Sequence, residues 1–203
     1  MIGLIDYGLS NLVCVQSAIN YLGYKTTIVK KHNELKNISK IILPGVGAFG
    51  DAIKNLKKQG LFSELEEQVF VKKKYFLGIC LGAQLICKES EEFGNHKGFG
   101  WINTSVRKIK SNDLSVRVPH SGWNNLILKK DDPILKEINE ECLFYFTHSF
   151  GIFLDNPSQE IATCSHGENF SVIVNHKNIY GVQFHPEKSQ QKGLELLSNF
   201  LFL

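Results

Sequence analysis

The sequence lacks several features that would place it in a specialised class of protein. It has no apolar run approaching the roughly 18 residues that a membrane span needs, and it opens at Met1-Ile2-Gly3 without a basic leader. Its five cysteines are odd in number and form no Cys-x-x-Cys pair, which argues against a zinc site or a dithiol redox site. We therefore expect a cytoplasmic protein that has no membrane contact, no metal and no other cofactor.

The chain also lacks a strong excess of either charge. A net charge of +3 is small for 203 residues, and lysines lie near acidic residues through much of the sequence. Such a balance gives no reason to expect a nucleic acid or an acidic membrane as partner. The length suits one domain, 1–203, with a core large enough to form without disulfides or metal.

The order of the predicted elements indicates an α/β fold. Short apolar strands alternate with amphipathic helices in the first half, the first helix running from Asn11 to Gly23, as in a parallel sheet covered on both faces. The predicted strands are 2–6, 26–29, 40–43, 101–109, 125–128, 143–147, 161–165, 171–175 and 179–184. Helix returns only in the last dozen residues. We predict a central, mostly parallel sheet with flanking helices and an additional β-rich region.

A cysteine stands where a strand is predicted to turn sharply into a helix. The segment Gly78-Ile79-Cys80-Leu81-Gly82 follows the apolar run 75–77, which is typical of a nucleophile elbow. The two glycines would leave room for a strained turn and for a substrate, and the thiol would stand exposed where the helix dipole favours the thiolate. An isolated cysteine would more simply be a buried structural residue, but the glycine frame favours a nucleophile.

A cysteine nucleophile needs an imidazole, and the imidazole needs a partner that sets its tautomer. His185 and Glu187 are two residues apart, so extended backbone would place both side chains on one side. Pro186 biases His185 towards extended conformations. Alone, this segment could be an exposed turn. Together with the elbow, it predicts a triad of Cys80, His185 and Glu187 at the carboxyl edge of the sheet.

Attack on a carbonyl group also requires hydrogen-bond donors for the oxyanion. We expect one donor to be the backbone N–H of Leu81. A second would come from the glycine-rich loop after the strand at 40–43, through Val46 or Gly47. The alternative for this loop is a structural turn without a role in catalysis.

These segments together resemble the class I, triad-type glutamine amidotransferases, which carry Gly-x-Cys-x-Gly-x-Gln and a later His-Pro-Glu. Within that superfamily, the chain is similar to the glutaminase subunits of imidazole glycerol phosphate synthases in four strings: Ile5-Asp6-Tyr7-Gly8, Pro44-Gly45-Val46-Gly47-Ala48-Phe49, Pro119-His120-Ser121-Gly122-Trp123-Asn124 and Gln183-Phe184-His185-Pro186-Glu187-Lys188-Ser189. The resemblance spans essentially the whole chain. It implies that glutamine is hydrolysed through a cysteine thioester, and that ammonia passes to a (β/α)₈ synthase partner in histidine biosynthesis.

The resemblance also implies roles for further residues. Gln84, the Gly47 backbone, Ser149 and Phe150 would hold glutamine. Phe150 stands where tyrosine is usual, a change that a backbone contact would tolerate, and Ser149 and Phe150 could instead simply end a buried strand. The interface with the synthase partner would include Asn11, Trp123, Asn124, Lys188 and Ser189. Trp123 could equally belong to the core of the β-rich region.

Two other functions stay open, and a third is disfavoured. A paralogue could supply ammonia for sugar modification in cell-surface glycan synthesis, because Ala83, Ser121 and the segment 98–101 depart from the histidine-pathway pattern. An elbow-cysteine hydrolase or peptidase is more remote, since a histidine directly after the cysteine would favour that class and Leu81 stands there. The intact triad argues against a third function, that of an inactive binding subunit.

Overall fold

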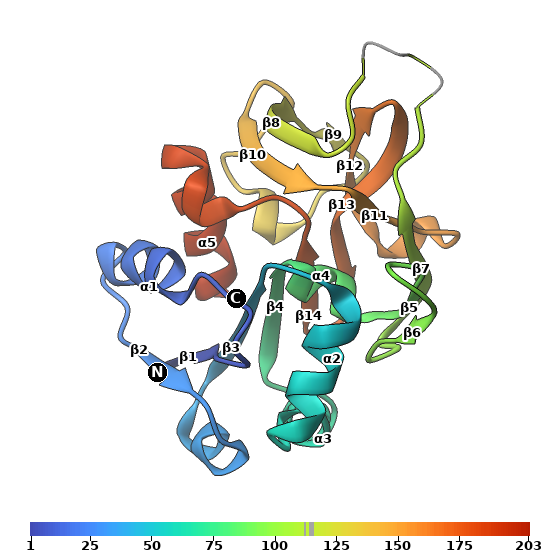
Figure 1. Cartoon of the computed structure of the whole chain (residues 1–203). Coiled ribbons are helices and arrows are strands. Elements are labelled where there is room, and N and C mark those ends of the chain that lie inside the picture. The colour runs from blue at the N-terminus through green and yellow to red at the C-terminus, as the bar shows by residue number, and fades with distance from the viewer. Residues whose placement is uncertain (112, 114–115) are drawn as a thin grey trace.

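A large mixed sheet runs through the chain in our computed structural model, which describes residues 1–111, 113 and 116–203 (Figure 1). Five of its strands are parallel neighbours. In spatial order they are β2 (Thr26–Val29), β1 (Ile2–Ile5), β3 (Lys40–Gly45), β4 (Tyr75–Cys80) and β14 (Ile179–Val182). The predicted parallel sheet in an α/β fold is therefore confirmed.

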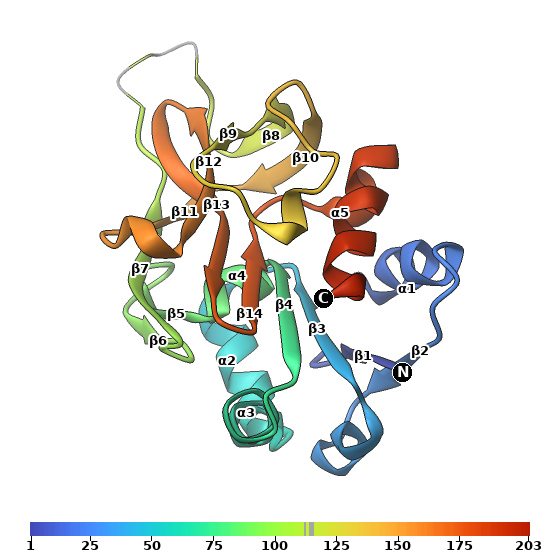
Figure 2. The same cartoon turned by 180° about the vertical axis from the view of Figure 1, so that it is seen from behind.

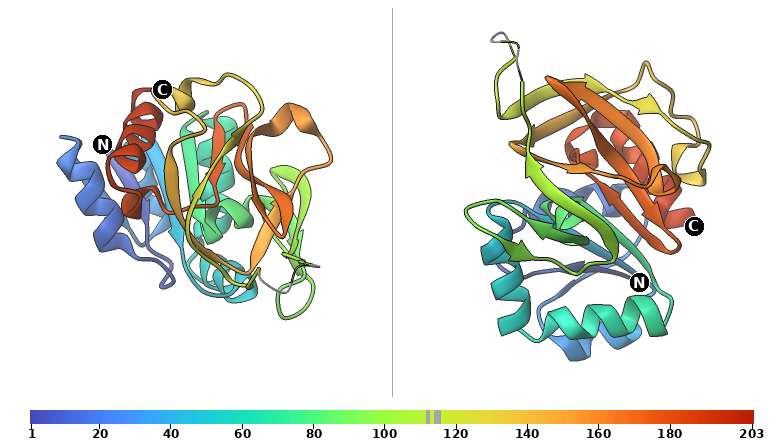
Figure 3. Two further views of the ribbon diagram at one scale, coloured as in Figure 1. Left: turned by 90° about the horizontal axis from the view of Figure 1, so that it is seen from above. Right: turned by 90° about the vertical axis from the view of Figure 1, so that its right-hand side faces the viewer.

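Beyond β14 the sheet becomes mostly antiparallel. These strands are β13 (Glu168–His176), β11 (Phe150–Phe153), β7 (Ile102–Lys108), β5 (Cys87–Ser90) and β6 (His96–Lys97), with β12 (Glu160–His166) and β9 (Ile127–Leu128) branching from β13. A separate two-stranded sheet consists of β8 (His120–Asn125) and β10 (Leu143–His148). Together these strands form the predicted β-rich region, most of which lies above the carboxyl edge of the parallel strands in the side view of Figure 3, while β5 and β6 lie beside them (Figure 1).

Four strands were not expected from the sequence, namely β5, β6, β8 and β11. β8 is the clearest example, because its His-Ser-Gly-Trp-Asn-Asn sequence has no alternation of apolar residues and owes its conformation to six-residue pairing with β10. The predicted strand 125–128 is interrupted at Leu126. The strand predicted to reach Phe184 ends at Val182, because the chain then turns towards β10, where the His185 N–H donates to the Tyr145 carbonyl at 2.9 Å.

One predicted loop starts later than expected. β3 continues through Pro44 and Gly45, which pair with Ile79 and Cys80 of β4. A proline costs a sheet only one donor and is tolerated close to a strand end. The loop after β3 is therefore reduced to Val46, Gly47 and Ala48, and it begins directly opposite the cysteine.

Helices cover both faces of the parallel strands (Figure 1 and Figure 2). They are α1 (Leu12–Tyr21), α2 (Phe49–Lys58), α3 (Leu61–Glu66), α4 (Leu81–Leu85) and α5 (Gln190–Phe202), with shorter 3₁₀ or π turns at His32–Asn37, Glu67–Val71, Pro133–Leu135, Pro157–Gln159 and Pro186–Lys188. Side chains of β3 alternate between the two cores, since Ile42 packs with α1 and α5 while Ile41 and Leu43 pack with α2 and α3. Within the described ranges, no helix is both long and apolar enough to cross a membrane.

Candidate active site

The predicted elbow is present at the end of β4. Cys80 is the last residue of the strand and has φ +53° and ψ −109°, a backbone conformation that residues other than glycine rarely adopt. A Cβ at Gly82 would lie 1.8 Å from the Leu43 carbonyl oxygen, and one at Gly78 would lie 2.5 Å from the Gly82 oxygen. Both glycines are thus needed for close backbone packing inside the elbow and against β3, rather than for the approach of a substrate.

The expectation of an exposed thiol is wrong. Cys80 is only 6% exposed, and the cavity into which it faces is also lined by residues 147–150, where β10 is joined to β11. These residues belong to the β-rich region, so the sequence around the elbow gives no indication that they lie beside Cys80. The cysteine therefore lies within the site and not on the open surface.

His185 and Glu187 form the predicted pair, but not through extended backbone. The His185 Nδ1 lies 2.8 Å from the Glu187 Oε1, and both side chains are almost fully buried. His185 itself is extended, with φ −100° and ψ 94°, as Pro186 led us to expect. The chain then enters a 3₁₀ turn at Pro186–Lys188, so the contact closes across a turn instead of along one side of a strand.

The environment of His185 favours the charged ring. Burial lowers the pKa of His185, but the neighbouring Cys80 and Glu187 outweigh burial and raise the pKa to about 10. Within the described part of the chain, the buried His185 Nε2 has no hydrogen-bond partner. The carboxylate thus holds one ring nitrogen, and the other is available at the cavity.

A cavity of about 300 Å³ joins the candidate residues. This volume suits a small ligand. It is lined by Val46, Gly47, Cys80, Leu81, Gln84, Glu92, Thr147, His148, Ser149, Phe150 and His185. All residues predicted for the oxyanion and for glutamine therefore lie in one place, with Glu187 behind His185.

Three residues of this wall, Glu92, Thr147 and His148, were missed by the sequence reasoning. Glu92 Oε2 accepts a hydrogen bond from the Phe49 N–H at 2.8 Å, at the start of α2. Its carboxylate is a suitable partner for a ligand ammonium group. Nothing in the spacing of Glu92 from Cys80 indicates this position, because it depends on how β5 is paired with β6 and β7.

Gln84 is held by two hydrogen bonds. Its Nε2 donates to the Phe150 carbonyl at 2.8 Å and to Gln183 Oε1 at 3.0 Å, which uses both amide hydrogens. What Gln84 can offer a ligand is therefore its carbonyl oxygen, an acceptor. The Phe150 carbonyl therefore bonds to Gln84 within the chain, and a contact of Phe150 with glutamine stays a prediction.

The expected oxyanion donors differ in their availability. Leu81 is the first residue of α4, and its N–H has no acceptor inside the helix. Val46 is not free, because its N–H donates to the Leu9 carbonyl at 2.8 Å. The prediction for Val46 is therefore contradicted in this conformation. Gly47, with φ +102°, stays as the donor expected from this loop.

The family model for class-I glutamine amidotransferases matches residues 3–203 of the chain. The chain belongs to this family. Among curated proteins, this amidotransferase is 40% identical to "Imidazole glycerol phosphate synthase subunit HisH 2" of Nitrobacter winogradskyi, over 98% of this chain and 97% of the relative. It is 44% identical to the subunit of the same name from Vibrio vulnificus, over 98% and 92% of the two chains.

Solved structures show the same fold at lower identity. A crystal structure described as a glutamine amidotransferase has a TM-score of 0.77 at 19% identity, covering 99% of the amidotransferase and 97% of that chain. PurLQS from Thermotoga maritima gives a TM-score of 0.76 at 18% identity, with the same coverage. The class I amidotransferase fold expected from the sequence is confirmed.

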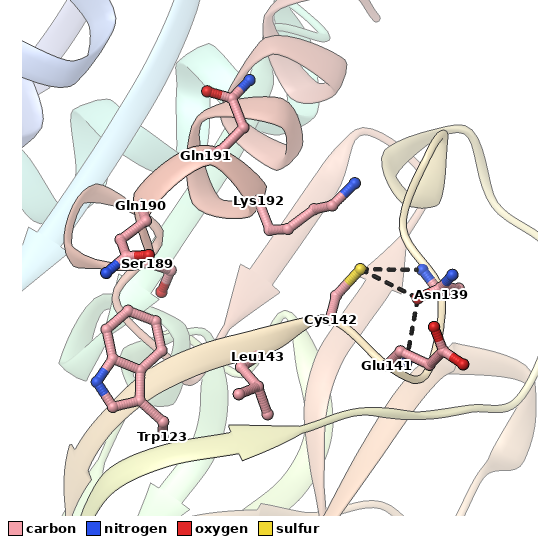
Figure 4. A pocket seen from close by; sticks show the side chains of 9 residues that line it. All are labelled: Trp123, Asn139, Glu141, Cys142, Leu143, Ser189, Gln190, Gln191 and Lys192. Atoms are coloured by element: carbon pink, nitrogen blue, oxygen red, sulfur yellow. Dashed lines mark hydrogen bonds between the residues drawn. The ribbon is translucent and has the colours of Figure 1, made fainter.

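Two of the predicted interface residues lie on the surface of the amidotransferase. Trp123 is 45% exposed, so the alternative of a core residue is wrong. The Trp123 and Tyr145 rings meet edge to face with centroids 5.9 Å apart, and the ammonium of the exposed Lys188 lies 5.8 Å from the centroid of the Tyr145 ring. A cavity of about 590 Å³ opens beside Trp123, between β10 and the start of α5 (Figure 4).

The other predicted interface side chains bond within the chain. Ser189 is only 1% exposed; its hydroxyl donates to the His185 carbonyl at 2.6 Å and accepts from the Tyr145 N–H at 3.0 Å. The hydroxyl is therefore engaged inside the chain, and a role of Ser189 in partner contact stays a prediction. Asn124 donates to the Ser165 carbonyl and lies 3.3 Å from His120. Asn11 is half-buried, and its amide donates to Cys14 Sγ.

Proposed function

We propose that the chain is the glutaminase subunit of an imidazole glycerol phosphate synthase, with Cys80, His185 and Glu187 as its catalytic triad. The carrying observation is the cavity in which Cys80 and His185 face the segment 147–150 while Glu187 holds the far nitrogen of the imidazole. The names of its curated relatives support the assignment to that synthase.

The first half of the reaction forms a thioester. The sulfur of Cys80 attacks the side-chain amide carbon of glutamine, and the negative oxygen of the tetrahedral intermediate accepts hydrogen bonds from the N–H groups of Leu81 and Gly47. His185 Nε2 then gives a proton to the departing nitrogen, and ammonia leaves as the carbon–nitrogen bond breaks.

The second half consumes one water. His185, now neutral, takes a proton from water as it attacks the thioester, and the proton returns to the cysteine side as glutamate is released. The products balance as glutamate and ammonia from glutamine and water. Glu187 keeps the Nδ1–H of His185 in place throughout, so that Nε2 always faces the reacting carbon.

Substrate selection follows from the wall of the cavity. The Glu92 carboxylate and the Gln84 carbonyl oxygen are acceptors that suit the ammonium group of an amino acid. Ser149 and Phe150 close the side opposite the elbow. A peptide has no free ammonium at this position, which favours free glutamine over a peptide substrate.

Ammonia would be delivered to a (β/α)₈ synthase partner docked on the surface around Trp123, Tyr145 and Lys188. A half-exposed tryptophan beside a cavity of about 590 Å³ is a suitable anchor for such a contact (Figure 4). The Val46–Leu9 hydrogen bond keeps one loop N–H away from the oxyanion position in the isolated chain. Low activity alone and stimulation by the partner are the expected result.

The test is glutamate release from glutamine by the chain alone and together with its synthase partner. Strong stimulation by the partner supports the proposal. Hydrolysis of simple amides or peptides without preference for glutamine would refute it and favour an unrelated cysteine hydrolase. Synthesis from a sugar substrate, and not from the ribosyl-aminoimidazole nucleotide, would move the chain to glycan synthesis.

We place the protein in the cytoplasm. Its cysteines at positions 14, 80, 87, 142 and 164 are all free thiols, as a reducing compartment would keep them. Fractionation of cells with an antibody against the chain tests this location.

A further inference from the structure

Two buried histidines next to the glutamine cavity have no part in the mechanism described above. His120 begins β8 and His148 ends β10, and the two residues are directly paired in the small sheet. They are 3% and 7% exposed, and His148 lines the cavity. A third imidazole, His166, stacks on His120 with ring centroids 4.0 Å apart.

The hydrogen bonds of these histidines run in one direction. The Phe150 carbonyl can only accept, so the His148 Nδ1 at 2.7 Å must carry hydrogen and donate to it. In the neutral ring this leaves Nε2 as an acceptor for the His120 Nδ1 at 3.2 Å. The His120 Nε2 then accepts from the Asn124 amide at 3.3 Å, whose second hydrogen goes to the Ser165 carbonyl.

The environment supports this neutral assignment. Burial, with a smaller contribution from the nearby His166 and His185, lowers the pKa of His148 to about 4, although the hydrogen bond to Phe150 opposes this shift. Burial likewise lowers the pKa of His120 to about 3, together with the charges of His148 and His166. Both rings therefore stay uncharged at neutral pH, and each nitrogen has a single role.

We call the hydrogen-bonded series from Asn124 through His120 and His148 to the Phe150 carbonyl the relay. At its Phe150 end, further hydrogen bonds connect it to Cys80. The Phe150 carbonyl that accepts from His148 also accepts from the Gln84 amide. Gln84 donates its other hydrogen to Gln183 Oε1, and the Gln183 Nε2 lies 3.8 Å from the Cys80 sulfur. An unbroken series of hydrogen bonds thus connects β8 to the cysteine, and the wall of the glutamine cavity lies along it.

We propose that His148 and His120 are positioning residues of the glutaminase site, which as Nδ1–H tautomers anchored by Asn124 fix the Phe150 carbonyl and, through it, Gln84. The inference rests on the proposed function, because it concerns the same cavity. Without the relay, one donor to the Phe150 carbonyl is lost and the segment 147–150 is free to shift. Glutamine must then order this wall when it binds, which raises KM more than it lowers kcat.

The kinetic test uses the complex with the synthase partner. His148→Phe keeps the size of the ring and removes both nitrogens, and we expect about a tenfold rise in the KM for glutamine, the size typical of one buried partner lost. His148→Asn retains a donor near the Nδ1 position and should recover part of the loss. His166→Phe is the matched control, because His166 stacks in the same cluster but bonds to the Arg117 carbonyl outside the relay. We expect a KM close to the wild-type value for it.

Two results in these assays would overturn the relay. One is a wild-type KM in His148→Phe, and the other is an equal rise in His148→Phe and His166→Phe, which would indicate general loosening of the cluster. In both cases the wild-type complex still hydrolyses glutamine, so the proposed function stands. A wild-type complex that releases no glutamate from glutamine overturns the function and the relay together.

Tautomers give a test that does not depend on folded variants. Long-range ¹⁵N–¹H spectra of the full-length ¹⁵N-labelled chain should show two histidines as neutral Nδ1–H tautomers that do not titrate from about pH 5.5 to 8, as expected for depressed pKa values. The His148→Asn spectrum, or selective labelling if that variant does not fold, assigns the signals. An Nε2–H tautomer of His120 or His148, or titration of either residue within this range, would refute the relay.

Discussion

Replacing Ser189 by alanine tests whether this residue supports the interior or contacts a partner. Its hydroxyl makes two buried hydrogen bonds, to the His185 carbonyl and from the Tyr145 N–H. The carbonyl keeps a second donor, the Lys188 N–H at 3.0 Å, so its loss is one net hydrogen bond of about 1 kcal/mol. The Tyr145 N–H loses this acceptor, which costs about 2 kcal/mol when a buried group is left unpaired.

We therefore expect Ser189→Ala to lower the free energy of unfolding by about 3 kcal/mol. The assay is urea unfolding of the isolated chain followed by circular dichroism, with an unchanged m-value as a check on two-state behaviour. Ser63→Ala, on the exposed face of α3, is the matched control and should change stability by less than about 0.5 kcal/mol. An unchanged unfolding curve for Ser189→Ala, with weaker partner binding instead, would refute this reasoning and restore the interface role.

Three further predictions concern the site itself. Cys80→Ala should abolish glutamine hydrolysis but leave synthesis from added ammonium salts intact in the complex; loss of both activities would contradict a role confined to ammonia release. Glu187→Gln should reduce turnover about 100-fold, because it removes the carboxylate that orients His185 while both reactive groups stay, and a full rate in steady-state assays would exclude Glu187 from the triad. Because the pKa of His148 is lowered to about 4 in the folded chain, the unfolded chain takes up the proton first as pH falls below about 6.5. His148 should therefore lower the free energy of unfolding by about 3 kcal/mol between pH 7 and pH 4. In urea unfolding at these two pH values, His148→Phe should show a loss of stability that is smaller by this amount than in the wild type.

The parts of the fold that could be predicted are those in which each segment carries its own pattern. The apolar strands of the parallel sheet and the helix α1 were found within one or two residues of their observed bounds. β8 and β11 could not be found, because His120-Ser121-Gly122-Trp123-Asn124-Asn125 and Phe150-Gly151-Ile152-Phe153 have no regular alternation and become strands only through pairing with β10, β7 and β13. Long-range pairing of this kind leaves no local signal.

The site divides in a similar way. Cys80, His185 and Glu187 could be predicted because their chemistry requires particular residue types at particular turns. The buried hydrogen bonds of Ser189 could not be predicted, because its position near Glu187 says nothing about the direction of its side chain, which is set by the 3₁₀ turn at Pro186–Lys188 and by β10. Glu92 was missed since its approach to the cavity depends on contacts between distant strands.

Adjacency of β4 and β14 has a consequence for how the sequence can vary. The two strands pair in parallel up to Ile79 and Val182, and Cys80 comes one residue and His185 three residues after that last pair. The spacing of sulfur and imidazole is therefore set by strand register, although just over half of the chain lies between them in sequence. Insertions in outer turns such as the exposed one between β11 and β12 change the length of the chain and leave that spacing alone. Deletion of one residue within β14 would instead move His185 by about 3.3 Å and reverse the side-chain directions. Segments for grafting are therefore to be sought among the outer turns, and the β4–β14 ladder is the part to keep unaltered.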